Sequence, residues 1–498
     1  MPGDPGADDS PRRATRGMHA NTAVNLAGYS LPILVALVTV PRYLAIVGQE
    51  RYGVLLIVWI MLGYFGVFDL GLGRATTHEM ARVATGDAKG RSDVLWTATT
   101  INTAMGVLGG LVLLPISYVL IAYVFKMPHQ LRTEVVDSLP FLALAVPFST
   151  ITSVFTGALQ GCERFVASNI VVVVSGVLFQ VVPLIVAKAN GRNLVPLIGA
   201  AIGVQGVTML VGFAACARLI PAGRYHFDRA RVGRLFKFGA WISVTGVIEP
   251  LLTILDRILV GATVGARGVT RYSVPFNIAT RIWILPVSFS RTTFPRIAAL
   301  PPAEAEEVAQ SMARALFVIM TPIVVVGLVL FEPFIHVWIG HQLGASAPRI
   351  GAILLVGAWI DALAYAPGVF MQARGRPDVP AKLHLYEFIP FLVVLWAGLK
   401  VAGVEGGAAV WTLRVAVDGA LRVWTCGVRW RLGPYAVSGV ALLAAAFATA
   451  MLLPGDSAMR ISADVILLGG IGFWAWRSTP ESVWAAILRR RGLGTPVA

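Results

Sequence analysis

Residues 165–217, FVASNIVVVVSGVLFQVVPLIVAKANGRNLVPLIGAAIGVQGVTMLVGFAACA, contain two long apolar runs separated by the short polar connector 190–193. A helix needs about 20 mostly apolar residues to cross roughly 30 Å of hydrocarbon, and each run is long enough to do so. The same alternation of apolar run and short connector extends from residue 21 to residue 476. The chain is therefore predicted to be an all-α polytopic membrane protein.

The composition supports a membrane protein. Only 13% of the residues are charged and 56% are hydrophobic, with a mean hydropathy of +0.74, whereas a soluble domain has about 25% charged residues. We count fourteen apolar stretches that could each cross the bilayer. The predicted limits of these helices are 21–47, 52–73, 93–124, 138–160, 165–189, 194–217, 236–262, 268–292, 310–338, 346–372, 379–402, 404–428, 434–453 and 461–476.

The helices are predicted to form two parallel six-helix lobes, since each group of six has an even number of crossings and so runs in the same direction. Val47-Gly48 and Val264-Gly265 recur at a spacing of 217, as expected for a repeat. Helices thirteen and fourteen fall outside the repeat, carry almost no charge apart from Asp464, and are predicted to be peripheral. The predicted segments are a disordered tail (1–20), an N-lobe (21–217), a basic connector (218–235), a C-lobe (236–428), two further helices (429–476) and a second tail (477–498).

The distribution of Lys and Arg predicts the orientation, because basic residues of short loops stay on the cytoplasmic side. With the N-terminus inside, 26 of the 41 basic residues fall in inner loops, tails and the adjoining helix ends, and 10 fall in outer loops and the adjoining helix ends. An even number of crossings then places the C-terminus in the cytoplasm as well. The net charge of +15 is dispersed between membrane helices, so topology explains it and nucleic-acid binding is not predicted.

Motifs for catalysis and metal binding are not found. His78 and Glu79 begin a zinc-protease pattern, but Arg82 stands where the second His is required. The cysteines have no spacing typical of a metal site, and their positions near the predicted inner helix ends suit a reducing compartment. These cysteines are Cys162, Cys216 and Cys426. The chain is not predicted to be an enzyme, and neither a metal nor an organic cofactor is expected.

Four short motifs of the first two helices and one set in the second half resemble polysaccharide-export flippases of the multidrug/oligosaccharidyl-lipid/polysaccharide superfamily. These are NTAVN (21–25), PRYL (41–44), GQERYG (48–53), FDLGL (68–72), and Asp256-Arg257 with Gly265 and Tyr272-Ser273. The resemblance implies a two-lobed transporter that moves a polyprenyl-pyrophosphate-linked oligosaccharide from the inner to the outer leaflet of the bacterial inner membrane. It implies the assembly of O-antigen, capsule or exopolysaccharide, with membrane lipids and possible polymerase or chain-length proteins as partners.

Five arginines fall within predicted helices at least five residues from either end, where a charge facing lipid costs about 2.5–3.5 kcal/mol on insertion scales. They are Arg42, Arg257, Arg281, Arg414 and Arg422. Because guanidinium grips phosphate oxygens with two hydrogen bonds, they are predicted to bind the substrate pyrophosphate. Alternatives remain open: Arg42 and Arg257 could reach the headgroups, Asp256 could pair with Arg257, and the Arg414/Asp418/Arg422 stripe could be an ion-pair ladder.

Acidic residues suggest ion coupling. Glu249 and Asp361 lie near the middle of helices seven and ten, the depth at which transporters bind coupling ions, so a role with Na⁺ or H⁺ is predicted beside the alternative of structural ion pairs. Asp69, five residues before Arg74, is expected to be structural or to act in gating. Two other classes are less favoured: a multidrug cation antiporter of the same fold, and a membrane glycosyltransferase, polymerase or ligase.

Overall fold

The structure is a computed structural model that describes residues 10–64, 69, 71–84, 87–220, 226–229, 231–233 and 254–479. The regular secondary structure of these residues is helical, and no strand occurs among them. Nine of the described helices are long and apolar enough to cross a membrane. The predicted all-α membrane fold is confirmed, and the count of fourteen crossings stays a prediction.

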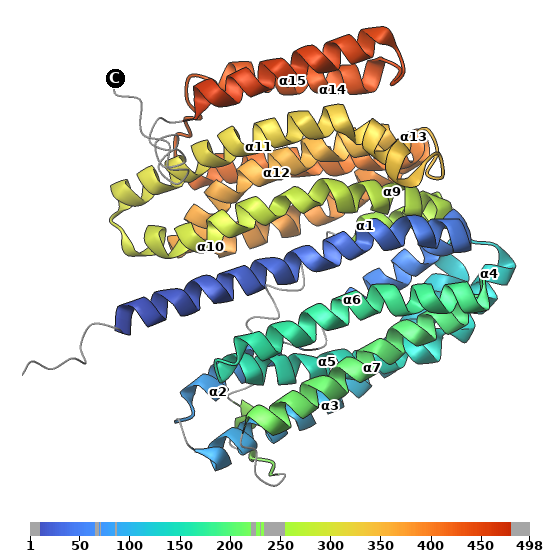
Figure 1. Ribbon diagram of the computed structural model, residues 1–498, viewed down its shortest axis with the longest axis vertical. Coiled ribbons are helices and arrows are strands. Elements are labelled where there is room, and N and C mark those ends of the chain that lie inside the picture. Colours follow the sequence, from blue (N-terminus) through green and yellow to red (C-terminus); the bar gives the residue numbers. More distant parts are fainter. Residues whose placement is uncertain are drawn as a thin grey trace, which may run out of the picture. The chain divides into compact units, whose positions relative to one another are not determined.

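The chain divides into a first unit, residues 1–254, and a second unit, residues 255–498. Within each unit, long helices run side by side (Figure 1). The helices of the first unit are α1 (Ser10–Tyr64), α2 (Leu72–Arg82), α3 (Ala88–Val119) with a π-helical turn (Leu120–Val124), α4 (His129–Asp137), α5 (Leu139–Gly161), α6 (Phe165–Asn190) and α7 (Leu194–Leu219). Helix α1 begins inside the segment predicted to be a disordered tail.

The second unit begins with the described end of the predicted seventh helix, residues 255–263. It continues with α9 (Ala266–Ala279), a 3₁₀ turn (Thr280–Trp283), α10 (Ile284–Ala299), α11 (Pro302–Ile339), α12 (Ala347–Ala373), α13 (Asp378–Cys426), α14 (Ala436–Leu452) and α15 (Ala458–Ser478). The predicted eighth helix, 268–292, is therefore interrupted, and the interruption falls at Arg281.

Helix α1 is a hairpin rather than one straight rod. Tyr43 and Trp59 would lie about 24 Å apart along a continuous helix, yet their ring centroids are 5.7 Å apart. The reversal occurs at Gly48, whose φ of 80° and ψ of 168° are not helical. This conformation is essentially restricted to glycine. The break agrees with the predicted boundary between the first two helices.

Helix α13 folds back in the same way. Ala402 and Gly403 have non-helical dihedrals, and Glu387 before the break pairs with Arg414 after it at 3.6 Å. Along a straight helix these two residues would be about 40 Å apart. We call residues 378–401 the first arm and residues 404–426 the second arm of α13.

Small residues allow close packing in the first unit. A Cβ atom on Gly157 of α5 would lie 2.3 Å from the carbonyl oxygen of Gly73 in α2. The two backbones are thus nearly in contact, as is common where membrane helices associate through van der Waals packing. Apolar side chains from α2, α3, α5 and α7 then close the core around this contact.

Helices α14 and α15 pack against each other and against α11, at the edge of the second unit (Figure 1). They were expected to carry almost no charge apart from Asp464, but α15 begins at Ala458 and includes Arg460, which is only 2% exposed. The predicted start of this helix, residue 461, missed Arg460 by one position.

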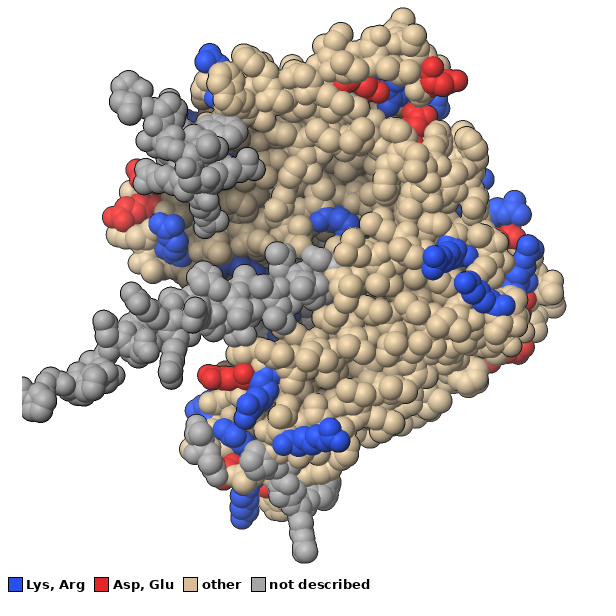
Figure 2. Space-filling model, in the orientation of Figure 1, with Lys and Arg blue, Asp and Glu red and all other residues tan. Residues whose placement is uncertain are grey.

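On the face shown in Figure 2, most Lys, Arg, Asp and Glu side chains lie toward the ends of the helices, and other residue types cover most of the long helix faces. Apolar side chains such as Leu111, Val172 and Val465 remain exposed on these faces, at 66%, 55% and 65%. Exposed apolar faces bounded by charge at both ends suit a bilayer. The chain is therefore a multi-pass membrane protein.

Candidate functional site

The buried charges of the second unit centre on the two arms of α13. Asp418, 2% exposed, accepts a hydrogen bond from Arg422 Nε at 3.0 Å, and its other oxygen lies 2.6 Å from Arg422 Nη2. Arg422 Nη2 also lies 2.7 Å from His384 Nε2 on the first arm. Because guanidinium can only donate, His384 Nε2 accepts in this geometry, which requires a neutral imidazole protonated at Nδ1.

Arg414 lies one helical turn before Asp418 on the second arm, and it contacts the first arm. Its Nη1 lies 3.6 Å from Glu387 Oε2, and its guanidinium carbon lies 5.3 Å from the ring centre of Phe391. The predicted stripe of Arg414, Asp418 and Arg422 thus exists on one face of the second arm. It makes ion pairs, as in the ladder alternative, and binding of a substrate anion by this stripe stays a prediction.

Asp256 and Arg257 lie in the same unit. Asp256 is fully buried and accepts hydrogen bonds from the Tyr272 hydroxyl at 2.8 Å and from the backbone N–H of Arg257 at 2.6 Å. The Arg257 guanidinium stacks on Phe276, 4.3 Å from the ring centre. The Phe276 ring in turn lies 5.1 Å from that of Trp411 on α13. Arg257 therefore lies against an aromatic cluster that extends to α13.

Arg281 differs from these arginines because it is exposed, in the 3₁₀ turn that separates α9 from α10. Within the described part of the chain, no carboxylate pairs with its guanidinium. The 3₁₀ turn lies between two helices that would otherwise form a single membrane crossing. The Arg281 guanidinium, which has no carboxylate partner among the described residues, would be available to an anionic ligand at this point of the crossing.

The remaining predicted site residues lie apart from this cluster. Arg42 and Arg74 are exposed in the first unit, and Asp69 accepts a hydrogen bond from the backbone N–H of Gly73 at the start of α2, at 3.2 Å. This contact fits the structural role expected for Asp69. Asp361 is half-buried on α12, and Glu249 lies outside the described residues.

Sequence reasoning missed two members of the α13 cluster, His384 and Glu387. Both lie in the predicted eleventh helix, three positions apart and therefore on one helix face. A polar pair of this kind inside an apolar run was a usable signal. The partners of the arginines on the twelfth helix were not predicted, because the sequence does not show which residues of two neighbouring helices face each other.

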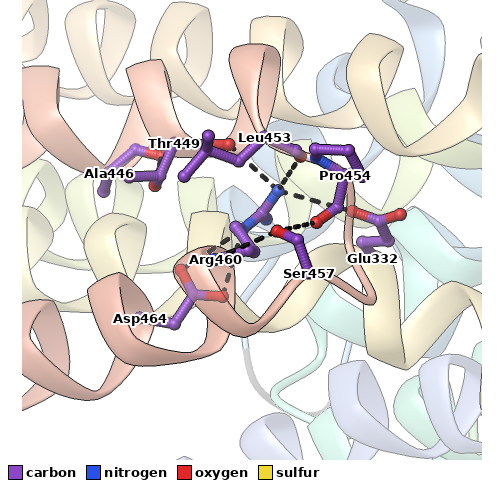
Figure 3. Close-up of polar contacts among 8 residues, drawn as sticks. All are labelled: Glu332, Ala446, Thr449, Leu453, Pro454, Ser457, Arg460 and Asp464. Carbon is purple, nitrogen blue, oxygen red and sulfur yellow. Dashed lines mark hydrogen bonds and ion pairs between the residues drawn. The ribbon is translucent and has the colours of Figure 1, made fainter.

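A second buried arginine cluster lies where α11 meets the α14–α15 connection (Figure 3). Arg460 Nε donates to Asp464 at 3.1 Å, and Nη1 donates to the backbone carbonyls of Thr449 and Leu453 at 3.0 and 3.1 Å. Nη1 also lies 3.5 Å from Glu332 of α11. The cluster borders a pocket of about 670 Å³. Its contacts satisfy the end of α14 and attach the hairpin to α11.

The chain belongs to the family described as polysaccharide biosynthesis protein, which it matches over residues 45–348, more than half its length. The predicted membership of a polysaccharide-export family is confirmed. A Shigella flexneri protein described provisionally as an O-antigen transporter is 27% identical over 81% of this chain and 96% of its own length. The Escherichia coli K12 lipopolysaccharide biosynthesis protein WzxC is 24% identical over 40% of each chain.

Solved structures agree on the fold. The lipid II flippase MurJ in an inward closed conformation gives a TM-score of 0.68, with 13% identity, over 92% of this chain and 99% of MurJ. An inward-facing multidrug resistance MATE family transporter of the MOP superfamily gives 0.66, with 15% identity, over 84% of this chain and 98% of its own. The fold is therefore that of MOP-superfamily transporters.

Proposed function

We propose that the protein is a flippase for a lipid-linked oligosaccharide with a pyrophosphate linkage, acting by alternating access between the two leaflets. The observation that carries this proposal is the set of arginines in the second unit of a chain from a polysaccharide biosynthesis family. The names of the Shigella and Escherichia coli relatives support O-antigen or another lipopolysaccharide glycan as the substrate class.

The chemistry of the arginines suits a phosphate-bearing substrate. Arg281 is exposed in a helix break, and Arg257 keeps its guanidinium against an aromatic ring. A pyrophosphate carries at least two negative charges, and guanidinium binds such oxygens through charge-assisted pairs of hydrogen bonds. In the proposal Arg281 is the first contact, and Arg257, Arg414 and Arg422 of the same unit complete the set of cations that bind the pyrophosphate. Substrate binding by Arg42 of the first unit stays a prediction of its own.

Replacing Arg281 tests the proposal. Arg281→Ala should abolish glycan export while the protein stays in the membrane, because the exposed guanidinium has no described carboxylate partner whose loss would harm folding. Arg281→Lys should restore export only in part, since ammonium lacks the planar pair of donors. Surface glycan is measured by immunoblot or flow cytometry, and membrane level by tagged protein.

Arg349→Ala serves as the control, because Arg349 is also exposed but lies in the first turn of α12. It should export normally. Full export by Arg281→Ala would remove Arg281 from the site. Deletion of the gene tests the function itself: lipid-linked glycan should accumulate on the inner face, and unchanged surface glycan would reject the flippase proposal.

The remaining features belong to the same proposal. The protein acts without an organic cofactor and is not an enzyme, it lies in the bacterial inner membrane, and both termini are cytoplasmic. A Na⁺ or H⁺ gradient drives export, with Glu249 and Asp361 as the predicted ion-binding residues. Polymerase and chain-length proteins are the partners to which the exported glycan passes.

A multidrug cation antiporter is the alternative with the same fold, supported by the likeness to the MATE transporter. A cationic drug would meet the exposed charge of Arg281, which disfavours it electrostatically. The polysaccharide family match adds no support for this alternative. Uptake of a fluorescent cation by cells lacking the gene, compared with cells that express it, separates the two substrate classes.

A further inference from the structure

A small groove lies on the surface of α13, between its two arms. Its volume is about 130 Å³, several times the roughly 30 Å³ that one water occupies in the liquid. Apolar side chains including Val394, Leu413 and Val417 form most of its lining, and they are 43%, 55% and 44% exposed. Two charged side chains also line the groove, Glu387 and Arg414. The groove therefore brings a buried acid close to the molecular surface.

The Glu387 carboxyl is the least satisfied of the buried acids in this cluster. It is 9% exposed, and neither of its oxygens accepts a hydrogen bond from a described donor. Its contact with Arg414 at 3.6 Å is longer than a hydrogen bond. The neighbouring Asp418 has Arg422 on both oxygens, at 3.0 and 2.6 Å. Of the two acids, Asp418 is therefore the one whose carboxylate is fully engaged by Arg422.

Three charged groups of the second arm act on Glu387. The negative charge of Asp418 disfavours the ionised form of Glu387, whereas the positive charges of Arg414 and Arg422 favour that form. Helices α9 and α12 also pack against α13. Tyr272 of α9, which is hydrogen-bonded to Asp256, lies within electrostatic reach of Arg414. On the first arm itself, the titratable His384 lies 3.8 Å from Asp418. Protonation of Glu387 would relieve the repulsion from Asp418 and break no hydrogen bond. It would also end the ion pair that joins the two arms.

We infer that Glu387 is a proton-binding site of the transport cycle, loaded and released through the α13 groove, and that the coupling ion of the proposed flippase is therefore H⁺. A metal cation such as Na⁺ is disfavoured there because the Arg414 guanidinium already lies beside the carboxylate. Glu387 takes up the proton when its ion pair with Arg414 opens, and releases the proton when that ion pair forms again. This inference rests on the flippase function for its role in export, but not for proton binding itself.

Proton binding can be tested on the purified full-length protein without any glycan. Dicyclohexylcarbodiimide modifies protonated carboxyl groups in apolar surroundings, and peptide mass spectrometry locates the modified residue. Glu387 should be modified, increasingly so as the pH falls from mildly alkaline to mildly acidic. Asp378, an exposed acid of the same helix that is paired with Lys382 at 2.7 Å, is the internal control and should show little modification. Absence of modification at Glu387 across this range would overturn the inference.

The role in transport is tested in cells. Wild-type export should fall when a protonophore collapses the gradient, and Glu387→Gln should lose this protonophore-sensitive part of export while its membrane level and thermal midpoint stay close to wild type. Glu387→Asp should retain part of it, and Asp378→Asn should behave as wild type. Export by Glu387→Gln that is as large and as protonophore-sensitive as wild type would reject the coupling role. Failure of the flippase proposal looks different, because surface glycan would then survive deletion of the gene while the carbodiimide result stands.

Discussion

Arg460 is a buried side chain of α15 that contacts both α11 and α14. Its guanidinium contacts Glu332, Asp464 and two backbone carbonyls. Arg460→Ala should destabilise the protein by about 3 kcal/mol, the lower end for a broken buried ion pair, because Glu332 and Asp464 keep some contact with solvent. A lower thermal unfolding midpoint in detergent would show the loss.

The matched control is Arg477→Ala, at the other end of α15, where the side chain is exposed. An exposed charge on a helix end contributes little, so this variant should unfold close to the wild-type midpoint. Equal midpoints for the two variants would mean that the Arg460 contacts do not stabilise the hairpin.

Individual residues were predicted unevenly from the sequence. Arg414, Asp418 and Arg422 share a face because of their spacing, and the structure confirms that arrangement. Their partners Glu387 and His384 come from the other arm of the hairpin. Which residues become partners depends on the register between the two arms, and the sequence of one helix does not determine its register with the next.

At the scale of the elements, the two hairpin reversals occur at glycines, Gly48 in α1 and Gly403 in α13. Gly48 has a φ of 80° and a ψ of 168°, and an added Cβ would have no atom within 4 Å. Gly48→Ala should therefore destabilise through the backbone alone, by about 1–3 kcal/mol. Thermal unfolding of the purified protein measures the effect.

Gly203 of α7 is the appropriate comparison, because it also has open space around its Cβ position but is helical. Gly203→Ala should be neutral or stabilise by up to about 1 kcal/mol, following helix propensity. A loss of stability at Gly203 as large as that at Gly48 would contradict the backbone explanation.

The elements themselves follow largely from apolar run length. The predicted helix 138–160 corresponds to α5, Leu139–Gly161, and 194–217 corresponds to α7, Leu194–Leu219. The predictions fail where a helix departs from regular geometry, as in the 3₁₀ turn at Arg281. Apolarity measures whether a segment can enter lipid, and it does not register a local change in hydrogen bonding.

At the scale of the whole molecule, the predicted orientation can be tested with natural cysteines. Cys162 lies between α5 and α6, on the predicted cytoplasmic side, whereas Cys216 and Cys426 are buried. A membrane-impermeant maleimide should label Cys162 only after cells are opened. Burial raises the pKa of the Cys162 thiol, against the opposing charges of Arg91 and Arg164. Because the thiolate is the reactive form, labelling should be slow at neutral pH. Its rate should rise about tenfold for each unit of increase in pH, as long as the pH stays below that pKa.

Arg192→Cys provides the opposite case, since residue 192 is exposed in a connector predicted to be external. It should be labelled in intact cells. Labelling of Cys162 in intact cells at the rate seen for Arg192→Cys would reverse the predicted orientation.

The Arg460 contact also has a consequence for how the chain is made. The ribosome completes α11, with Glu332, well before α15 emerges, so an acceptor for the guanidinium is already present in the membrane. Before docking, an arginine near the end of a lone hairpin would face lipid or headgroups at a free-energy cost. The last hairpin, α14–α15, therefore has a reason to pack onto α11 as it leaves the insertion machinery. In a nascent chain without Glu332, the Arg460 guanidinium would keep its partners within the hairpin, Asp464 and two backbone carbonyls, but would lose the carboxylate that joins it to α11.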